Sequence, residues 1–196
     1  MNKLLLGLIL LISACAQKQE KRVADPLKDA SEKDRAAIET VIRYKEGLRN
    51  KYEGQEIKKG VKIFDVEKKE PAKLDEIAKD SPILVLRFSE MECSICTDTV
   101  LRMIRSSGIN KKKVMLLCDI PSNVKNIRIF REKFGFEGKI YRLDSDLLAG
   151  NELKKLGFPF MFIADGQSKL NQVFFPERYA ETKTRAYLKS IKEKLN

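Results

Sequence analysis

Apolar runs and amphipathic repeats alternate along the second half of the chain. Short runs rich in β-forming residues predict strands, and apolar positions at helical spacing between them predict helices. The predicted strands are 83–88, 114–120, 139–143, 160–164 and 172–175, and the predicted helices are 97–107, 123–134, 145–156 and 177–195. This alternation is typical of an α/β domain in which helices flank a central mixed sheet, with one hairpin turn at Asp165-Gly166.

The chain ahead of residue 83 predicts an extension of that domain. Ser31 and Asp34 form a variant of the capping box, and the apolar residues that follow lie along one helical face, so we expect an amphipathic helix over 31–52. Short extended segments at 55–57 and 61–64, a polar turn at 68–71 and a short helix at 74–78 come next. The long helix either packs on the domain that it precedes or docks a partner protein.

Residues 1–14 predict an export signal. A positive start and an apolar run over 4–12, too short to span a bilayer, lead to Ser13-Ala14 and Cys15. This order resembles the lipobox of bacterial lipoproteins, which implies that Cys15 carries lipid and anchors the protein to a membrane. Ala16 after the cysteine implies, by the same resemblance, the outer membrane facing the periplasm. The alternative is a plain signal peptide with an incidental cysteine.

The polar residues within 15–30 predict a flexible tether between the lipidated cysteine and the domain.

The charge composition narrows the classes of function. The formal net charge of +11 is spread over the whole chain, without a basic motif rich in aromatic residues, so nucleic acid is not an expected partner. Attraction to an anionic membrane surface fits the charge better, and a solvated lysine-rich surface explains it most simply.

Cys93 and Cys96 stand where the strand over 83–88 gives way to a helix. The first turn of a helix leaves backbone N–H groups without partners and carries the positive end of the helix dipole, which favours a thiolate over a thiol. Two thiols at positions i and i+3 of such a turn can also close a disulfide. The Cys-Ser-Ile-Cys motif is therefore a candidate redox site.

The order strand, CxxC, helix, βαβ unit, Gly-x-Pro, hairpin and closing helix resembles the thioredoxin fold. More narrowly, it resembles the membrane-anchored TlpA-like thiol-disulfide oxidoreductases, which share the secretory anchor, the extra strands ahead of the central strand and the insertion represented here by 122–143. The resemblance covers the domain 55–196, and its sharpest marks are Cys93, Cys96 and Pro159.

The resemblance implies a role for each of these residues. Cys93 and Cys96 would be the catalytic pair and would form a redox-active disulfide, with no other cofactor. The Phe158–Pro159 bond would be cis and lie beside this disulfide, where the backbone of Phe158 pairs with an extended substrate peptide. Ser94 and Ile95 of the motif would complete the substrate-binding residues.

Departures from the family pattern affect the expected redox potential. Glu92 replaces the usual Trp, Ser94-Ile95 replaces Gly-Pro, and Arg87 stands where thioredoxins often carry a buried acid. Glu90 and Glu92 disfavour a thiolate, whereas the helix terminus and Arg87 favour it. Because the chain has no His, any base that activates the second cysteine must be a carboxylate, a lysine or water.

The favoured interpretation is an enzyme that exchanges disulfides with other proteins of the bacterial cell envelope, in a direction that the sequence leaves open. The main alternative is a protein-binding module of the same fold whose disulfide does not cycle. A static disulfide gains little because the loop that it closes is short. Peroxide reduction is disfavoured by Glu90, which occupies the position of the expected hydroxyl residue. A metal site is not expected, since Cys15 would carry lipid and Cys118 lies within a predicted strand.

Overall fold

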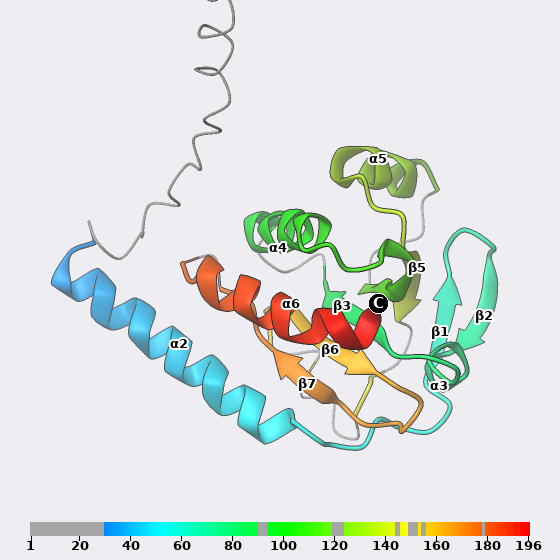
Figure 1. Ribbon diagram of the computed structural model, residues 1–196, viewed down its shortest axis with the longest axis horizontal. Helices are drawn as coiled ribbons and strands as arrows, with labels where there is room; N and C mark the ends of the chain where they lie inside the picture. Colours follow the sequence, from blue (N-terminus) through cyan, green and yellow to red (C-terminus); the bar gives the residue numbers. More distant parts are fainter. Residues whose placement is uncertain are drawn as a thin grey trace, which may run out of the picture.

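The computed structural model describes residues 30–89, 94–118, 124–143, 146–148, 153, 156–177 and 179–196. Its strands are β1 (Lys62–Asp65), β2 (Glu70–Lys73), β3 (Ile83–Phe88), β4 (Val114–Cys118), β5 (Lys139–Leu143), β6 (Phe160–Ala164) and β7 (Asn171–Phe174). Its α-helices are α2 (Glu32–Tyr52), α3 (Leu74–Ile77), α4 (Ser94–Ser106), α5 (Val124–Phe134) and α6 (Glu181–Leu195). The strands form a seven-stranded sheet in the order β2-β1-β5-β4-β3-β6-β7 (Figure 1).

Strand β3 is the centre of the sheet. It pairs in parallel with β4 and antiparallel with β6, and β4 continues in parallel to β5. Alternate residues of β3 enter two separate apolar clusters: Leu84, Leu86 and Phe88 belong to one and Val85 to the other. Both faces of the strand are therefore buried, as expected where parallel units are covered by helices.

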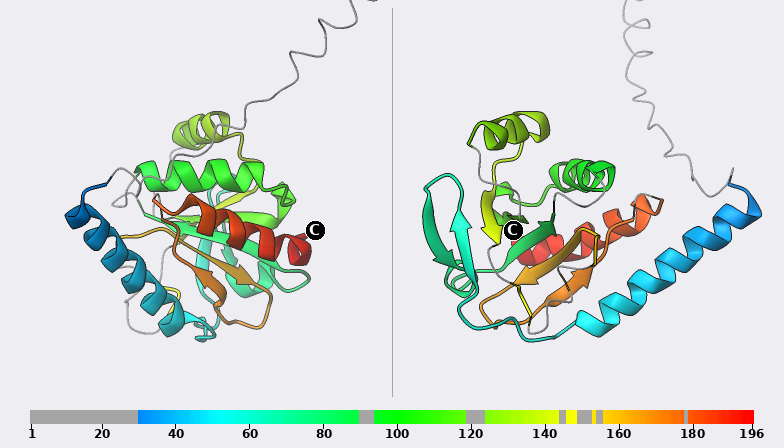
Figure 2. Two further views of the ribbon diagram at one scale, coloured as in Figure 1. Left: turned by 60° about the vertical axis from the view of Figure 1, so that its left-hand side comes forward. Right: turned by 180° about the vertical axis from the view of Figure 1, so that it is seen from behind.

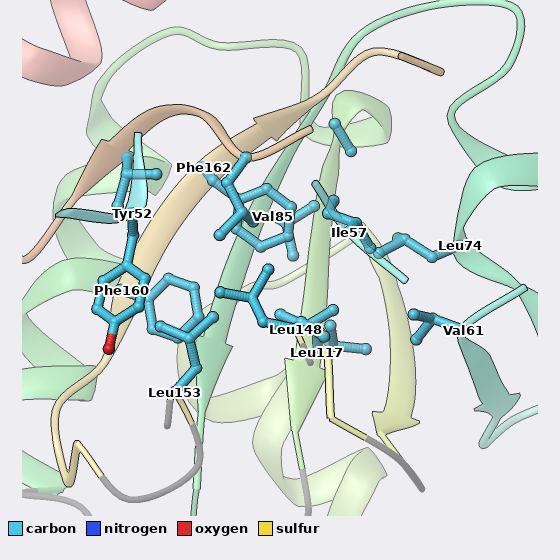
Figure 3. Close-up of a cluster of buried hydrophobic side chains, with 14 of the residues drawn as sticks. Tyr52, Ile57, Val61, Leu74, Val85, Leu117, Leu148, Leu153, Phe160 and Phe162 are labelled. Carbon is cyan, nitrogen blue, oxygen red and sulfur yellow. The ribbon is translucent and has the colours of Figure 1, made fainter. Parts of the chain in front are cut away.

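Helices cover the two faces of the sheet differently. Helices α4 and α6 supply the cluster on the side of Leu84, through residues that include Val100, Met103 and Ile191. The opposite cluster takes Leu48 and Tyr52 from α2 and Leu74 from α3. Figure 3 shows this second cluster, with Tyr52 beside Phe160 and Leu117 near Leu148. The two views of Figure 2 show α2 along the side of the domain where β7 lies.

The start of α2 follows the predicted capping box. Ser31 is the N-cap, and its hydroxyl accepts a hydrogen bond from the backbone N–H of Asp34 at 3.2 Å. The side chain of Lys45 on this helix is buried, whereas the residues of the first turns are exposed. Helix α2 therefore packs on the domain through its C-terminal half.

Three predicted elements are wrong in their type or bounds. The helix predicted over 97–107 begins three residues earlier, at Ser94, and ends at Ser106. Residues 68–71 were expected to form only a turn, but Glu70–Lys73 forms the edge strand β2, in which Pro71 lies opposite Phe64. An edge strand tolerates proline because one side of its backbone needs no ladder hydrogen bond. The last helix begins at Glu181 rather than at residue 177, because the chain first turns with the Ala180 N–H donating to the Glu177 carbonyl at 3.2 Å.

Several predictions fall on residues that the structure does not describe. The export signal over 1–14, Cys15 and nearly all of the tether over 15–30 lie outside the described residues, as does most of the helix expected over 145–156. Among the described residues, no helix combines the length and the apolar character needed to cross a membrane.

Two glycine-to-alanine substitutions test the packing of the sheet and of α2. A Cβ at Gly138 would lie 2.0 Å from the carbonyl oxygen of Val114, so Gly138→Ala must push β5 away from β4. We expect Gly138→Ala to lower the free energy of unfolding by about 1–3 kcal/mol or more.

A Cβ added at Gly47 of α2 would meet no heavy atom within 4 Å, so Gly47→Ala should raise the free energy of unfolding by about 0.5–1 kcal/mol. Urea unfolding measures both, and a Gly138→Ala protein as stable as the wild type would contradict the packing described.

Candidate functional site

The carboxyl end of β3 leads to the first turn of α4. Strand β3 ends at Phe88 and α4 begins at Ser94. Cys93, with Glu90 and Glu92, lies outside the described residues, so the structure describes Cys96 of the two motif cysteines. Cys96 lies in the first turn of α4 and is partly buried. The motif therefore stands at the strand-to-helix junction that the sequence predicts.

The first turn of α4 places the positive end of a helix dipole at Cys96. The first turn of α4 contains no acidic residue. Its backbone N–H groups and the positive end of the helix dipole are therefore not offset by a carboxylate of that turn. Spacing places Cys96 on the same side of α4 as Val100 and Met103, which are 2% and 3% exposed in the cluster beneath the helix.

The register of β3 and β6 brings Pro159 to the same end of the sheet. Arg87 of β3 lies opposite Phe160 of β6, and the two strands are antiparallel. Continuing this register by one residue places Pro159 beside Phe88, at the end of β3 from which the chain proceeds to α4. Pro159 is buried and Phe158 is partly buried. The Phe158–Pro159 segment and the first turn of α4 thus lie at the same end of the sheet, although they are far apart in the sequence.

The Phe158–Pro159 bond differs from the expectation. No peptide bond among the described residues is cis, so the predicted cis bond is wrong and this bond is trans. The trans isomer is intrinsically preferred by about 0.5–1 kcal/mol before proline, and the sequence pattern alone contains nothing that would overcome this preference.

Helix α2 contacts Phe158 directly. The ring of Tyr44 meets the Phe158 ring edge-on, with centroids 6.5 Å apart. The Lys45 ammonium lies 4.4 Å from the centroid of the same ring. Sequence reasoning missed both residues. One signal was present: Lys45 lies three residues after Ile42 and three before Leu48, on the apolar face of the helix.

Arg87 is buried at the predicted position, with only 3% of its surface exposed. Its guanidinium carbon lies 6.0 Å from the centroid of the Phe160 ring. Because side chains alternate along a strand, Arg87 shares the face of Val85, whereas α4 packs on the face of Leu86. The structure therefore places this cation across the sheet from the cluster beneath α4.

The other candidate residues are placed less completely. Ser94 and Ile95 open α4, but their side chains lie outside the description. Cys118 is 4% exposed, and its Sγ donates to the carbonyl oxygen of Tyr141 at 3.5 Å. Cys118 is thus a buried core thiol in β4, as predicted.

Comparisons with known proteins identify the fold. Neither a protein-family model nor a curated protein sequence matches the chain. A proposed electron transfer protein of Aquifex aeolicus VF5 is similar in structure, with a TM-score of 0.50 and 16% identity, over 69% of this chain and 96% of that one. A proposed protein disulfide isomerase of Bacteroides thetaiotaomicron has a TM-score of 0.53 and 14% identity, over 74% and 91% of the two chains. Together with the sheet order, these similarities show that the chain has a thioredoxin-like fold.

Proposed function

We propose that this protein is a thiol-disulfide oxidoreductase that uses Cys93 and Cys96. The observation that carries the proposal is the position of Cys96, partly buried in the first turn of α4, at the sheet end where the β3–β6 register also puts Pro159. On a thioredoxin-like fold, this arrangement offers a polarised helix terminus for a thiolate and an adjacent turn for a substrate chain.

The reaction is a pair of thiol-disulfide exchanges. The Cys93 thiolate attacks one sulfur of a target disulfide, an S–S bond forms between the two proteins, and the other target sulfur leaves as a thiolate. The Cys96 thiolate then attacks Cys93, closes the Cys93–Cys96 disulfide and releases the second target sulfur. The target gains two electrons and two protons overall, and the enzyme loses them. In reverse, the same pair donates a disulfide.

The sequence supports a narrower setting. The lipobox-like order ahead of Cys15 supports export and lipid attachment, with the domain facing the periplasm from the outer membrane. Partners in that setting are envelope proteins that carry disulfides or thiols, as for the TlpA-like proteins that the chain resembles. A membrane-anchored enzyme of this kind needs a dithiol reductant or a disulfide oxidant from elsewhere, and that partner sets the direction of electron flow.

Two features of the protein also fit a second function. Glu92 and Ser94-Ile95 depart from the usual motif, and Tyr44 of α2 is 54% exposed beside Phe158. A protein-binding module of the same fold with a disulfide that does not cycle would fit these features. Turnover separates the two functions, because such a module would bind partners without exchanging electrons.

Insulin reduction tests the enzyme directly. With dithiothreitol as the electron source, we expect the wild type to accelerate precipitation of the insulin B chain. The variant Cys93→Ser/Cys96→Ser should lose this acceleration. Cys118→Ala is the matched control: it also removes a thiol, but one buried in β4, and it should retain activity. A wild-type disulfide that never cycles would instead favour the binding module.

Single-cysteine variants test the order of attack. Cys96→Ala should accumulate mixed disulfides with envelope proteins, since Cys93 can still attack but nothing resolves the product. Cys93→Ala should accumulate none. Non-reducing gels of cells producing each variant, repeated after dithiothreitol treatment, measure this difference. If Cys96→Ala yields no reducible adduct, the assignment of Cys93 as the nucleophile is wrong.

Cys15→Ala tests the anchor. Loss of the lipidated residue should abolish labelling by a fatty acid. It should also move the protein from the membrane fraction to the soluble fraction, because the apolar segment of the signal does not by itself hold a mature domain at the membrane. Cell fractionation with a Cys118→Ala control measures the shift. Unchanged membrane association without lipid labelling would argue against lipid attachment at Cys15.

A further inference from the structure

Lys45 is a buried lysine on the face of α2 that packs on the domain. Only 6% of its surface is exposed, whereas Lys33 and Lys51 of the same helix are exposed. Burial of an ammonium group is unfavourable unless the group is paired and hydrogen-bonded. The residues that satisfy Lys45 therefore indicate which parts of the fold this side chain holds.

Two of its partners lie in the connection between β7 and α6. The Lys45 ammonium forms an ion pair with the carboxylate of Glu177, whose side chain is 13% exposed. It also donates a hydrogen bond to the carbonyl oxygen of Pro176 at 3.1 Å. These two contacts hold the ammonium against the connection between β7 and α6, where it is shielded from solvent.

The third contact reaches the candidate site. The same ammonium lies 4.4 Å from the centroid of the Phe158 ring, a favourable placement of a cation on an aromatic ring. Tyr44, the preceding residue of α2, contacts this ring from its edge. Phe158 directly precedes Pro159, so α2 holds the side chain next to the proline that the β3–β6 register places at the end of β3.

We propose that Lys45 is a positioning residue that holds the Phe158–Pro159 turn in the conformation that binds the extended chain of a protein substrate. The inference rests on the proposed function. In this role Lys45 acts through the ring of Phe158. The expected result is selectivity between substrates. A protein disulfide would pair with the turn along its backbone, so its binding should depend on Lys45. Binding of a small disulfide, which has no such backbone, should not.

The experiment compares two substrates with the full-length reduced protein. Insulin is the protein disulfide and hydroxyethyl disulfide is the small one. Lys45→Met keeps the length of the side chain and removes the charge, and Lys45→Arg keeps a cation that can pair with Glu177 and lie on Phe158. Lys33→Met is the matched control, because it removes an exposed lysine from the same helix.

The expected outcome is a change in KM for one substrate. Lys45→Met should raise KM for insulin about five- to ten-fold, corresponding to the loss of one desolvated cation–ring contact, with little change in kcat. Both constants for hydroxyethyl disulfide should stay as in the wild type. Lys45→Arg should restore most of the insulin affinity, and Lys33→Met should behave as the wild type.

Other outcomes overturn the inference. Equal effects on both substrates, or an unchanged KM for insulin, would reduce Lys45 to an anchor for α2. If circular dichroism shows that Lys45→Met is unfolded, Tyr44→Ala decides: it keeps Lys45 and should raise KM for insulin alone, about two- to three-fold. An unchanged KM for insulin in Tyr44→Ala would then contradict the inference. A wild type that reduces neither substrate would refute the proposed function itself, whereas an active wild type with indifferent variants would refute only the role of Lys45.

Discussion

The antiparallel pairing of β3 with β6 is the constraint on which the candidate site depends. A shift of one residue in this register would exchange the two faces of β6 and place each of its side chains in the wrong apolar cluster. Leu84 lies opposite Ile163 and Arg87 opposite Phe160, with apolar clusters on both faces, so packing on either side specifies the same register. The position of Pro159 at the end of β3 follows from this pairing rather than from any contact made by the proline itself.

The β7 edge of the sheet shows why α2 is part of the domain. The Glu53 carboxylate, just after α2, accepts hydrogen bonds from the backbone N–H groups of Gln172 and Val173 at 2.6 and 2.7 Å. The Tyr187 hydroxyl donates to the carbonyl oxygen of Gln172 at 2.8 Å. Side chains thus occupy backbone groups that an exposed edge strand would offer to another chain. Glu53 at one end and Lys45 further along the helix fix the path of α2 past Phe158.

The elements that the sequence predicts well are those whose signals are local. The apolar run of β3, the capping box at Ser31 and the strand bounds of β5 all depend on neighbouring residues, and the structure agrees with them. The missed features depend on distant partners. The position of Lys45 on the apolar face of its helix is visible in the sequence, but its partners Pro176 and Glu177 are not. The strand around Pro71 forms because β1 lies beside it. The isomer before Pro159 was missed for another reason: the family resemblance implied a cis bond, whereas the observed trans bond follows the intrinsic preference.

Two buried cations, Lys45 and Arg87, lie beside the aromatic residues that flank Pro159. Lys45 lies on the ring of Phe158 and Arg87 lies near the ring of Phe160, so a cation contacts the aromatic residue on each side of Pro159. The Lys45 ammonium is paired with the carboxylate of Glu177, which is consistent with the positioning role proposed for this residue. Arg87 is buried on the face of the sheet opposite α4. The first turn of α4 contains no acidic residue, so no carboxylate of that turn offsets the positive end of the helix dipole at Cys96. In the proposed function, α4 would stabilise the thiolate and α2 would place the substrate, so substitutions in α2 should alter substrate binding without altering the thiolate.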